Sequence, residues 1–228
     1  LQGVTHKETP AKFMGTAIHA RLLEPDVYAT EYVVAPEADK RTKEWKEFEI
    51  ANADKRILTA DQMASIEGIA HSVSQHKSAT TLLRAGRVEH SIIWQDEETG
   101  IWLKIRPDCL CIDFDIGICL DVKKTLDASP APFARACVTY DYDLQAAVYL
   151  EGLRQVFKRD FDFVFLPVEQ DAPHGCALYG APSEMLERGE RRFRQALHLL
   201  KSCRESGEWP SYQPAGDYAL LDWPRWAA

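Results

Sequence analysis

The sequence predicts an α/β fold in which a mixed central sheet is flanked by helices. Three observations indicate this class: helical apolar spacing precedes a β-rich block at 87–124, a second helical segment follows that block, and a further strand-like segment comes after it. Such an order of elements packs helices on the faces of one sheet. The 228 residues suffice for one domain. We therefore expect a single domain over 1–228, with its core at about 13–170 and a C-terminal helix and tail at 183–228.

The segments before the β-rich block are expected to be mostly helical. Residues 13–23 predict a short helix that Pro25 ends. Residues 37–56 are dense in charge and predict an exposed connection with some helix. Thr59 and Gln62 have the spacing of a capping box. The helix after this box carries its apolar side chains on one face, at Met63, Ile66, Ile69, Ala70 and Val73.

The β-rich block predicts three strands. Segments 87–95 and 101–112 flank the turn residues 96–100, so a hairpin is expected there. A second turn at 113–115 leads to a third strand at 116–124.

The C-terminal half alternates helix and strand. Pro130 and Pro132 indicate a loop, which a helix over 141–157 follows. Strands are expected at 161–169 and, more briefly, at 176–180. Ser183 opens a last helix with an apolar side formed by Met185, Leu186, Phe193, Leu197 and Leu200. The tail is rich in tryptophan and proline and is expected to pack as ordered irregular structure.

Composition narrows the class of protein. No apolar run approaches the ~18 residues of a membrane span, and no charged-then-apolar leader opens the chain. The chain begins at Leu1 rather than at a methionine, so we expect that a segment upstream is missing or removed. Six cysteines without a CxxC pair predict reduced thiols rather than a zinc or iron–sulfur site. These features predict a cytoplasmic protein without membrane association.

Alternation along two strands suggests a metal site. In 101–108, Asp108 lies on the even-numbered face, and in 116–124, Asp121 and Lys123 share a face. If these strands pair across the 113–115 turn, the two carboxylates converge with Lys123 beside them. Converging carboxylates repel unless a cation lies between them, and a few oxygen ligands suit Mg²⁺, with Mn²⁺ as a substitute. The alternative is two unrelated surface carboxylates at strand ends.

Three motifs carry a resemblance to a known family. Pro107-Asp108 and Asp121-Val122-Lys123 have twelve residues between the aspartates, Gln145-Ala-Ala-Val-Tyr149 lies on the predicted helix 141–157, and Gly15-Thr-Ala-Ile-His19 lies on the helix 13–23. Together with the element order, they resemble the αβββαβ core of PD-(D/E)xK nucleases with RecB-like motifs. The phrases GTAIHARLLEP, IRPD, LDVKKT and YDYDLQAAVY resemble RecE-type and phage-type alkaline exonucleases in particular.

This resemblance implies a Mg²⁺-dependent exonuclease that degrades linear double-stranded DNA from 5′ to 3′ and leaves 3′ single-stranded tails for recombination. It implies a single-strand annealing protein as partner. Lys123 would position or activate the attacking water, and Gln145 and Tyr149 would contact substrate or metal ligands. The metal ligands would be His19, Asp108, Asp121 and the carbonyl of Val122, while Glu89 is either a further ligand or a plain surface residue.

The sequence says less about how DNA is held. Arg106, Lys124 and Thr125 adjoin the motif and are expected to contact phosphate. Arg188, Arg191, Arg192 and Arg194 form a basic cluster that is either a DNA contact or a solvated helix face. The net charge of -8 disfavours nonspecific surface binding. Together with the family resemblance, it favours a homo-oligomeric ring, a trimer or tetramer, that encloses its DNA.

Two other functions remain open. One is an endonuclease on the same core, which the motifs at Gln145–Tyr149 and Gly15–His19 argue against. The other is a catalytically inactive DNA-binding module, which the presence of every expected motif residue disfavours.

Overall fold

A five-stranded mixed sheet forms the centre of the molecule, as predicted. The structure is a computed structural model and describes residues 8–113, 115, 117–213, 216 and 218–222. In spatial order, the strands are β3 (Arg87–Val88), β6 (Cys109–Cys111), β7 (Gly117–Thr125), β8 (Phe161–Glu169) and β9 (Tyr179–Gly180). Strands β7 and β8 are parallel, and the other neighbours are antiparallel. The expected pairing of the strands on either side of the 113–115 turn is confirmed, as β6 with β7.

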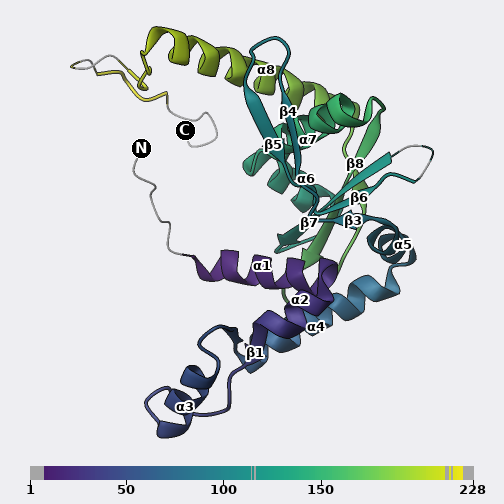
Figure 1. Cartoon of the computed structure of the whole chain (residues 1–228), viewed down its shortest axis with the longest axis vertical. Coiled ribbons are helices and arrows are strands. Elements are labelled where there is room, and N and C mark those ends of the chain that lie inside the picture. The colour runs from purple at the N-terminus through teal and green to yellow at the C-terminus, as the bar shows by residue number, and fades with distance from the viewer. Residues whose placement is uncertain (1–7, 114, 116, 214–215, 217, 223–228) are drawn as a thin grey trace.

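Helices cover both faces of this sheet (Figure 1). On one side lie α1 (Pro10–Leu23), α4 (Ala60–Gln75) and α5 (Lys77–Ala85), and on the other lie α6 (Pro130–Thr139), α7 (Tyr142–Phe157) and α8 (Ser183–Ser206). Because strand side chains alternate, Leu120 and Val122 of β7 join the first core, and Cys119 joins the second. The predicted capping box of Thr59 and Gln62 begins α4.

Two small β elements were not anticipated. Strands β1 (Tyr32–Val34) and β2 (Arg56–Leu58) pair in parallel, and α2 (Pro25–Glu31) and α3 (Lys43–Ala51) lie beside them, at the bottom of Figure 1. Pro25 therefore ends α1 as expected but also begins a new helix, because proline is tolerated in a first helical turn.

The long strands expected at 87–95 and 101–112 are each broken in two, which corrects their predicted faces. Strands β4 (Ile92–Gln95) and β5 (Trp102–Ile105) form a separate hairpin around the predicted turn. The hairpin leaves the main sheet because its apolar side packs on α7, where Gly152 allows Trp94 and Ile105 to approach the helix. At the break, Glu89 adopts a left-handed φ of 51°, which ends strand β3.

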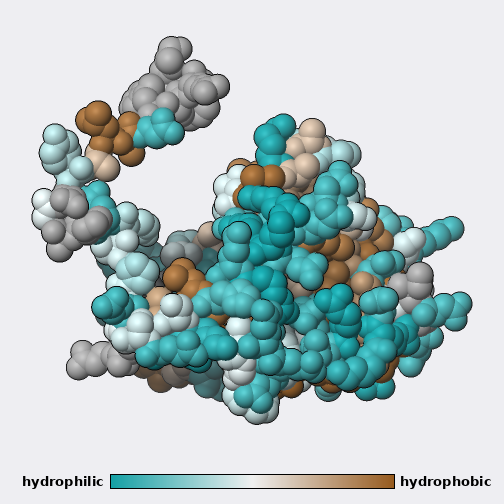
Figure 2. Space-filling view, turned by 90° about the horizontal axis from the view of Figure 1, so that it is seen from above, coloured by the Kyte–Doolittle hydropathy of each residue, from teal (hydrophilic) through white to brown (hydrophobic). Residues whose placement is uncertain are grey.

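Two further expectations were wrong. The loop predicted at Pro130 and Pro132 is the first turn of α6, where the missing proline N–H groups cost no helical hydrogen bond. The tail was expected to pack, but its described side chains are exposed. Among them, Trp209 is 66% exposed and Tyr212 fully exposed. Figure 2 shows the tail projecting from the body with hydrophobic residues on it.

The structure also bears on the expectations for the cysteines and for membrane-spanning segments. All six cysteines are free thiols and five of them are buried, as small apolar residues are. Among the described residues, no helix combines the length and apolar character needed to cross a membrane.

Candidate active site

The carboxylate of Asp121 and the ammonium of Lys123 lie on one face of β7. Asp121 is 1% exposed, and its Oδ2 lies 2.6 Å from the ammonium nitrogen of Lys123. Both side chains point to the α7 side of the sheet, because the alternate residues Leu120 and Val122 point to the α1 side. The prediction that Asp121 and Lys123 share a face is confirmed.

Gln145 of α7 connects these two groups. Its Nε2 donates to Asp121 Oδ1 at 2.7 Å, and its Oε1 accepts from Lys123 at 2.8 Å. The Lys123 ammonium also lies 4.6 Å from the ring centre of Tyr142, a cation–π contact. Tyr142 was missed in the sequence, although its position three residues before Gln145 places both side chains on one helix face. The lysine is thus held by a carboxylate, an amide and a ring.

Asp108 approaches the same strand from the segment between β5 and β6. Its Oδ2 accepts a hydrogen bond of 2.7 Å from the backbone N–H of Val122. Burial, and then the negative charge of Asp121, raise the pKa of Asp108 well above its usual value. Two carboxylates in such an environment resist being ionised together unless a cation joins them.

His19 of α1 faces this carboxylate. Its Nε2 lies 2.9 Å from the Val122 carbonyl oxygen, and its Nδ1 lies 3.5 Å from Asp108 Oδ2. Burial lowers the pKa of His19, which favours the neutral ring. A neutral ring that donates from Nε2 to a carbonyl turns an unprotonated Nδ1 toward Asp108. When Asp108 is ionised, two acceptors face each other, which is an arrangement that a metal ion relieves.

The donor set fits a divalent cation. Single ligand atoms of His19, Glu89 and Asp108 lie within 4.8 Å of one another. Carboxylate oxygens with one imidazole suit a divalent metal ion. Asp121 Oδ2 is buried, and its ion pair with Lys123 lacks the geometry of a hydrogen bond, so this oxygen has acceptor capacity left. Asp121 lies outside the cluster of three because its carboxylate is turned toward Lys123 and Gln145.

The remaining predicted residues surround this cluster. Glu89 also pairs with Arg106, whose Nε lies 2.5 Å from Glu89 Oε2, so Arg106 is occupied by a carboxylate rather than aligned with Asp108 on a strand. Tyr149 donates to the carbonyl of Arg106 at 3.4 Å and thereby holds the segment that carries Asp108. Lys124 and Thr125 lie further along β7, where they bond Gln170 and the carbonyl of Asp127, respectively.

The basic cluster on α8 is mostly structural. Arg188 and Arg192 pair with Asp143 of α7, which is 2% exposed, and Arg194 pairs with Asp96 of the hairpin turn. A freely solvated face therefore does not describe these three side chains. Because buried carboxylates need partners, the arginines fix α8 to its neighbours.

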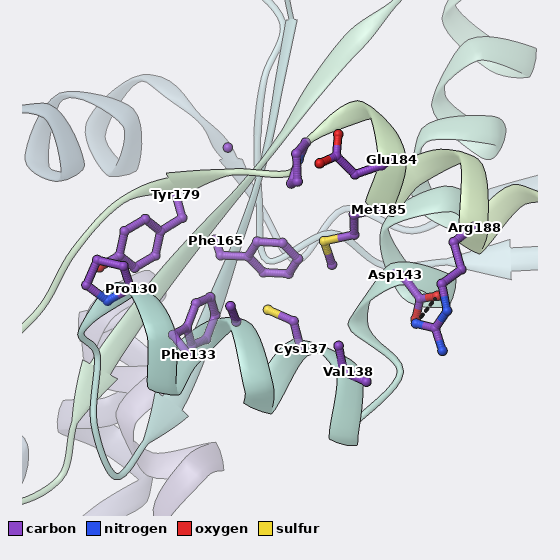
Figure 3. Close-up of a pocket in the computed structure, with 13 residues that line it drawn as sticks. Pro130, Phe133, Cys137, Val138, Asp143, Phe165, Tyr179, Glu184, Met185 and Arg188 are labelled. Atoms are coloured by element: carbon purple, nitrogen blue, oxygen red, sulfur yellow. Dashed lines mark hydrogen bonds and ion pairs between the residues drawn. The ribbon is translucent and has the colours of Figure 1, made fainter.

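Figure 3 shows an apolar hollow of about 400 Å³, whose lining includes none of the residues of the acidic cluster. Its walls are apolar side chains of α6, β8 and α8 such as Phe133, Phe165 and Met185. Of its charged groups, Asp143 and Arg188 neutralise each other, and Glu184 adds a negative charge. This hollow therefore offers little to a phosphate group.

We expect His19→Ala to weaken metal-dependent activity strongly without unfolding the protein. The imidazole is partly exposed and bonds only through Nε2 and Nδ1, so its loss removes a ligand rather than core packing. Titration of activity with Mg²⁺ and thermal unfolding, measured side by side, separate the two roles. A variant that unfolds early but keeps its activity per folded molecule would show that His19 is structural.

Comparisons with known proteins bear on the fold and the family of the chain. The family model for a PDDEXK-like domain of unknown function (DUF3799) matches residues 1–221. A crystal structure of a candidate exonuclease from Eubacterium rectale is 13% identical, with a TM-score of 0.65. The match covers 97% of this chain and 79% of that one. A structure of SSO0001 is also 13% identical and covers 88% of each chain, with a TM-score of 0.33. Among curated proteins, none matches the chain significantly.

The matched family and the observed sheet agree on the fold. The family model spans nearly the whole described chain, and the mixed sheet with flanking helices is the PDDEXK-like arrangement. The exonuclease-like neighbour shares this fold at an identity too low to transfer more than the fold. The chain therefore belongs to the family of PDDEXK-like domains described as DUF3799.

Proposed function

We propose that this protein is a metal-dependent exonuclease that degrades linear double-stranded DNA from 5′ to 3′. The observation that carries the proposal is that two groups of side chains lie next to each other at β7. One is the cluster of His19, Glu89 and Asp108, and the other is the network of Asp121, Lys123 and Gln145. A cation site beside a fixed lysine can serve phosphodiester hydrolysis.

Each side chain has a part in this scheme. Asp108, His19 and Asp121 would hold Mg²⁺, with Glu89 and the Val122 carbonyl as further ligands. When bound, the ion supplies Lewis-acid stabilisation of the charge on phosphate. Lys123 positions the attacking water and stabilises negative charge as it develops.

Gln145 and Tyr149 would act by holding other groups in place. Gln145 fixes the ammonium of Lys123 and the carboxylate of Asp121 relative to each other through its two hydrogen bonds. Tyr149 keeps the Asp108 segment against α7. Both residues would therefore set the geometry of the site rather than donate or accept a proton.

The finer assignment rests on the RecE-type resemblance of the motifs. It includes the 5′ to 3′ polarity, 3′ single-stranded products and a single-strand annealing partner for recombination. The endonuclease alternative shares the same side chains. Incubation of one DNA sequence in linear and covalently closed form decides between them: we expect degradation of the linear form alone, and cutting of the closed circle would overturn the exonuclease proposal.

Gly15 supports a role for α1 in substrate approach. It lies one turn before His19 on the same helix face, and a Cβ placed there would meet no atom within 4 Å. A helical glycine costs roughly 1 kcal/mol relative to alanine. Because the protein's own packing does not require the glycine, we infer that it leaves room for DNA beside His19.

We therefore expect Gly15→Ala to raise the melting temperature by about 2–4 °C while lowering kcat/KM for DNA several-fold. Thermal unfolding and initial cleavage rates measured on the same preparation check this. If Gly15→Ala is more stable and cuts DNA at the unchanged rate, the space beside His19 has no role in substrate approach.

We also propose a closed homo-oligomeric ring of three or four copies. The net charge of -8 implies that DNA phosphates are attracted only weakly to the protein surface. An enzyme that cuts the same DNA repeatedly therefore benefits from enclosing it. The tail offers uncovered apolar side chains for a head-to-tail contact, including Tyr218, Leu220 and Leu221, each more than 80% exposed.

Light scattering is expected to give three or four times the chain mass of 25.8 kDa, and removal of the chain after Gly207 should lower it. A monomer mass for the full chain, together with processive digestion, would contradict the ring.

A further inference from the structure

A second hollow opens beside the lysine of the active site. It has a volume of about 300 Å³, at the small end of the range for small-molecule sites. It lies between the end of β7 and α6, and its lining includes Lys124, Thr125, Arg135, Tyr140 and Tyr142. Tyr142 connects it to the active site, because its ring lies against the Lys123 ammonium.

Two aromatic rings form one side of this hollow. Tyr140 and Tyr142 stack with centroids 5.8 Å apart and an interplanar angle of 29°. Tyr142 is fixed from behind by Phe165, on which it also stacks. Tyr140, by contrast, is 66% exposed. The stack therefore ends in an open aromatic face beside the active site.

The charges around the hollow favour an anion. Lys124 and Arg135 contribute two cations, and within the part of the chain that the structure describes, the Arg135 guanidinium makes no ion pair. The Asp127 carboxylate, which also lines the hollow, accepts hydrogen bonds from the backbone N–H and hydroxyl of Ser129. These bonds and, to a smaller extent, the charge of Arg135 lower the pKa of Asp127. The rim therefore combines positive charge with an aromatic platform, which suits one nucleotide.

We propose that this hollow binds an unpaired nucleobase of the strand being cut, stacked on Tyr140, with its phosphate held by Arg135 and Lys124. The inference rests on the proposed function and adds where a nucleotide next to the cleaved phosphate is held. A base pair is too large for the hollow, so the base must leave its partner strand. Stacking on an aromatic ring tolerates any base, which suits degradation without sequence preference.

Tyr140→Ala tests this stacking, with Tyr140→Phe as the conservative variant and Trp102→Ala as the control at an exposed aromatic residue outside the hollow. Binding is measured in EDTA by fluorescence anisotropy of a labelled duplex with a single-stranded end, and cleavage is measured separately with Mg²⁺. We expect Tyr140→Ala to raise Kd and KM about 10-fold with kcat within about twofold, as for loss of one base–aromatic stack. Tyr140→Phe and Trp102→Ala should bind like the unchanged protein.

A second arm removes the base instead of the ring. Duplexes with a single abasic nucleotide at each of the first positions from the end are compared between the unchanged protein and Tyr140→Ala. At one position, the two proteins should bind equally, because the partner of Tyr140 is gone. Equal Kd for Tyr140→Ala and the unchanged protein on ordinary DNA overturns the proposal, as does a loss that persists at every abasic position. Absence of cleavage by the unchanged protein would instead overturn the proposed function, since the binding arm needs no cleavage.

Discussion

Replacing Lys123 with alanine is expected to lower the rate of DNA cleavage by ~10²-fold or more while the protein remains folded. The ammonium is the group placed to orient water and stabilise charge, and alanine supplies neither function. Its contacts to Asp121 and Gln145 are polar, so the fold keeps its apolar packing. Asp121→Ala should cause a similar loss, because it removes both a predicted metal ligand and the counter-charge of Lys123.

The measurement is single-turnover cleavage of a linear duplex, with thermal unfolding as the check on folding. Lys77→Ala, at an exposed lysine of α5, is the matched control and should cut normally. The cleavage rate of Gln145→Ala should fall between those of Lys123→Ala and Lys77→Ala. This variant loses the hydrogen bonds that connect Asp121 with Lys123 but keeps both charged groups. A folded Lys123→Ala or Asp121→Ala protein with near-normal rates would show that the site lies elsewhere.

Removal of divalent metal is the second change with a large expected effect. Activity should disappear in EDTA, return with Mg²⁺ or Mn²⁺ and fail with Ca²⁺ alone. The physical reason is that Ca²⁺ takes more ligands at longer, looser distances, whereas Mg²⁺ imposes a tight octahedron. The pairing of His19 with Asp108 and the unused capacity of Asp121 Oδ2 support a compact cation site of this kind.

Binding and cleavage should separate under these conditions. We expect Ca²⁺ to support DNA binding without product, and to inhibit when it is added in excess over Mg²⁺. The same titrations with His19→Ala should require more Mg²⁺ for half-maximal rate. Full turnover in the presence of EDTA would exclude the metal mechanism.

The sequence predicted the middle of the site well because the relevant patterns are local. Strand alternation placed Asp121 and Lys123 on one face, and helical spacing placed Gln145 on the helix that packs there. The mixed sheet followed from the order of helices and strands. Each of these inferences needed only neighbouring residues.

Expectations that depended on distant packing were less accurate. A single strand over 101–112 is locally reasonable, but the hairpin turns away to pack on α7, so Asp108 reaches the site from a break and not from a strand face. The arginines of α8 looked like a surface patch because Asp143, their partner, lies more than 40 residues earlier. The exposed tail could not be recognised from composition, because its tryptophans and prolines are equally compatible with packing.

The most direct test of the central claim follows the two ends of one strand. A linear duplex labelled at a 5′ end, and the same duplex labelled at the 3′ end of that strand, are incubated with the protein and Mg²⁺ and sampled over time. We expect immediate release of the 5′ label as a mononucleotide and gradual shortening of the 3′-labelled strand, both absent with Lys123→Ala. Discrete internal fragments, early loss of the 3′ label or an intact duplex would contradict this expectation.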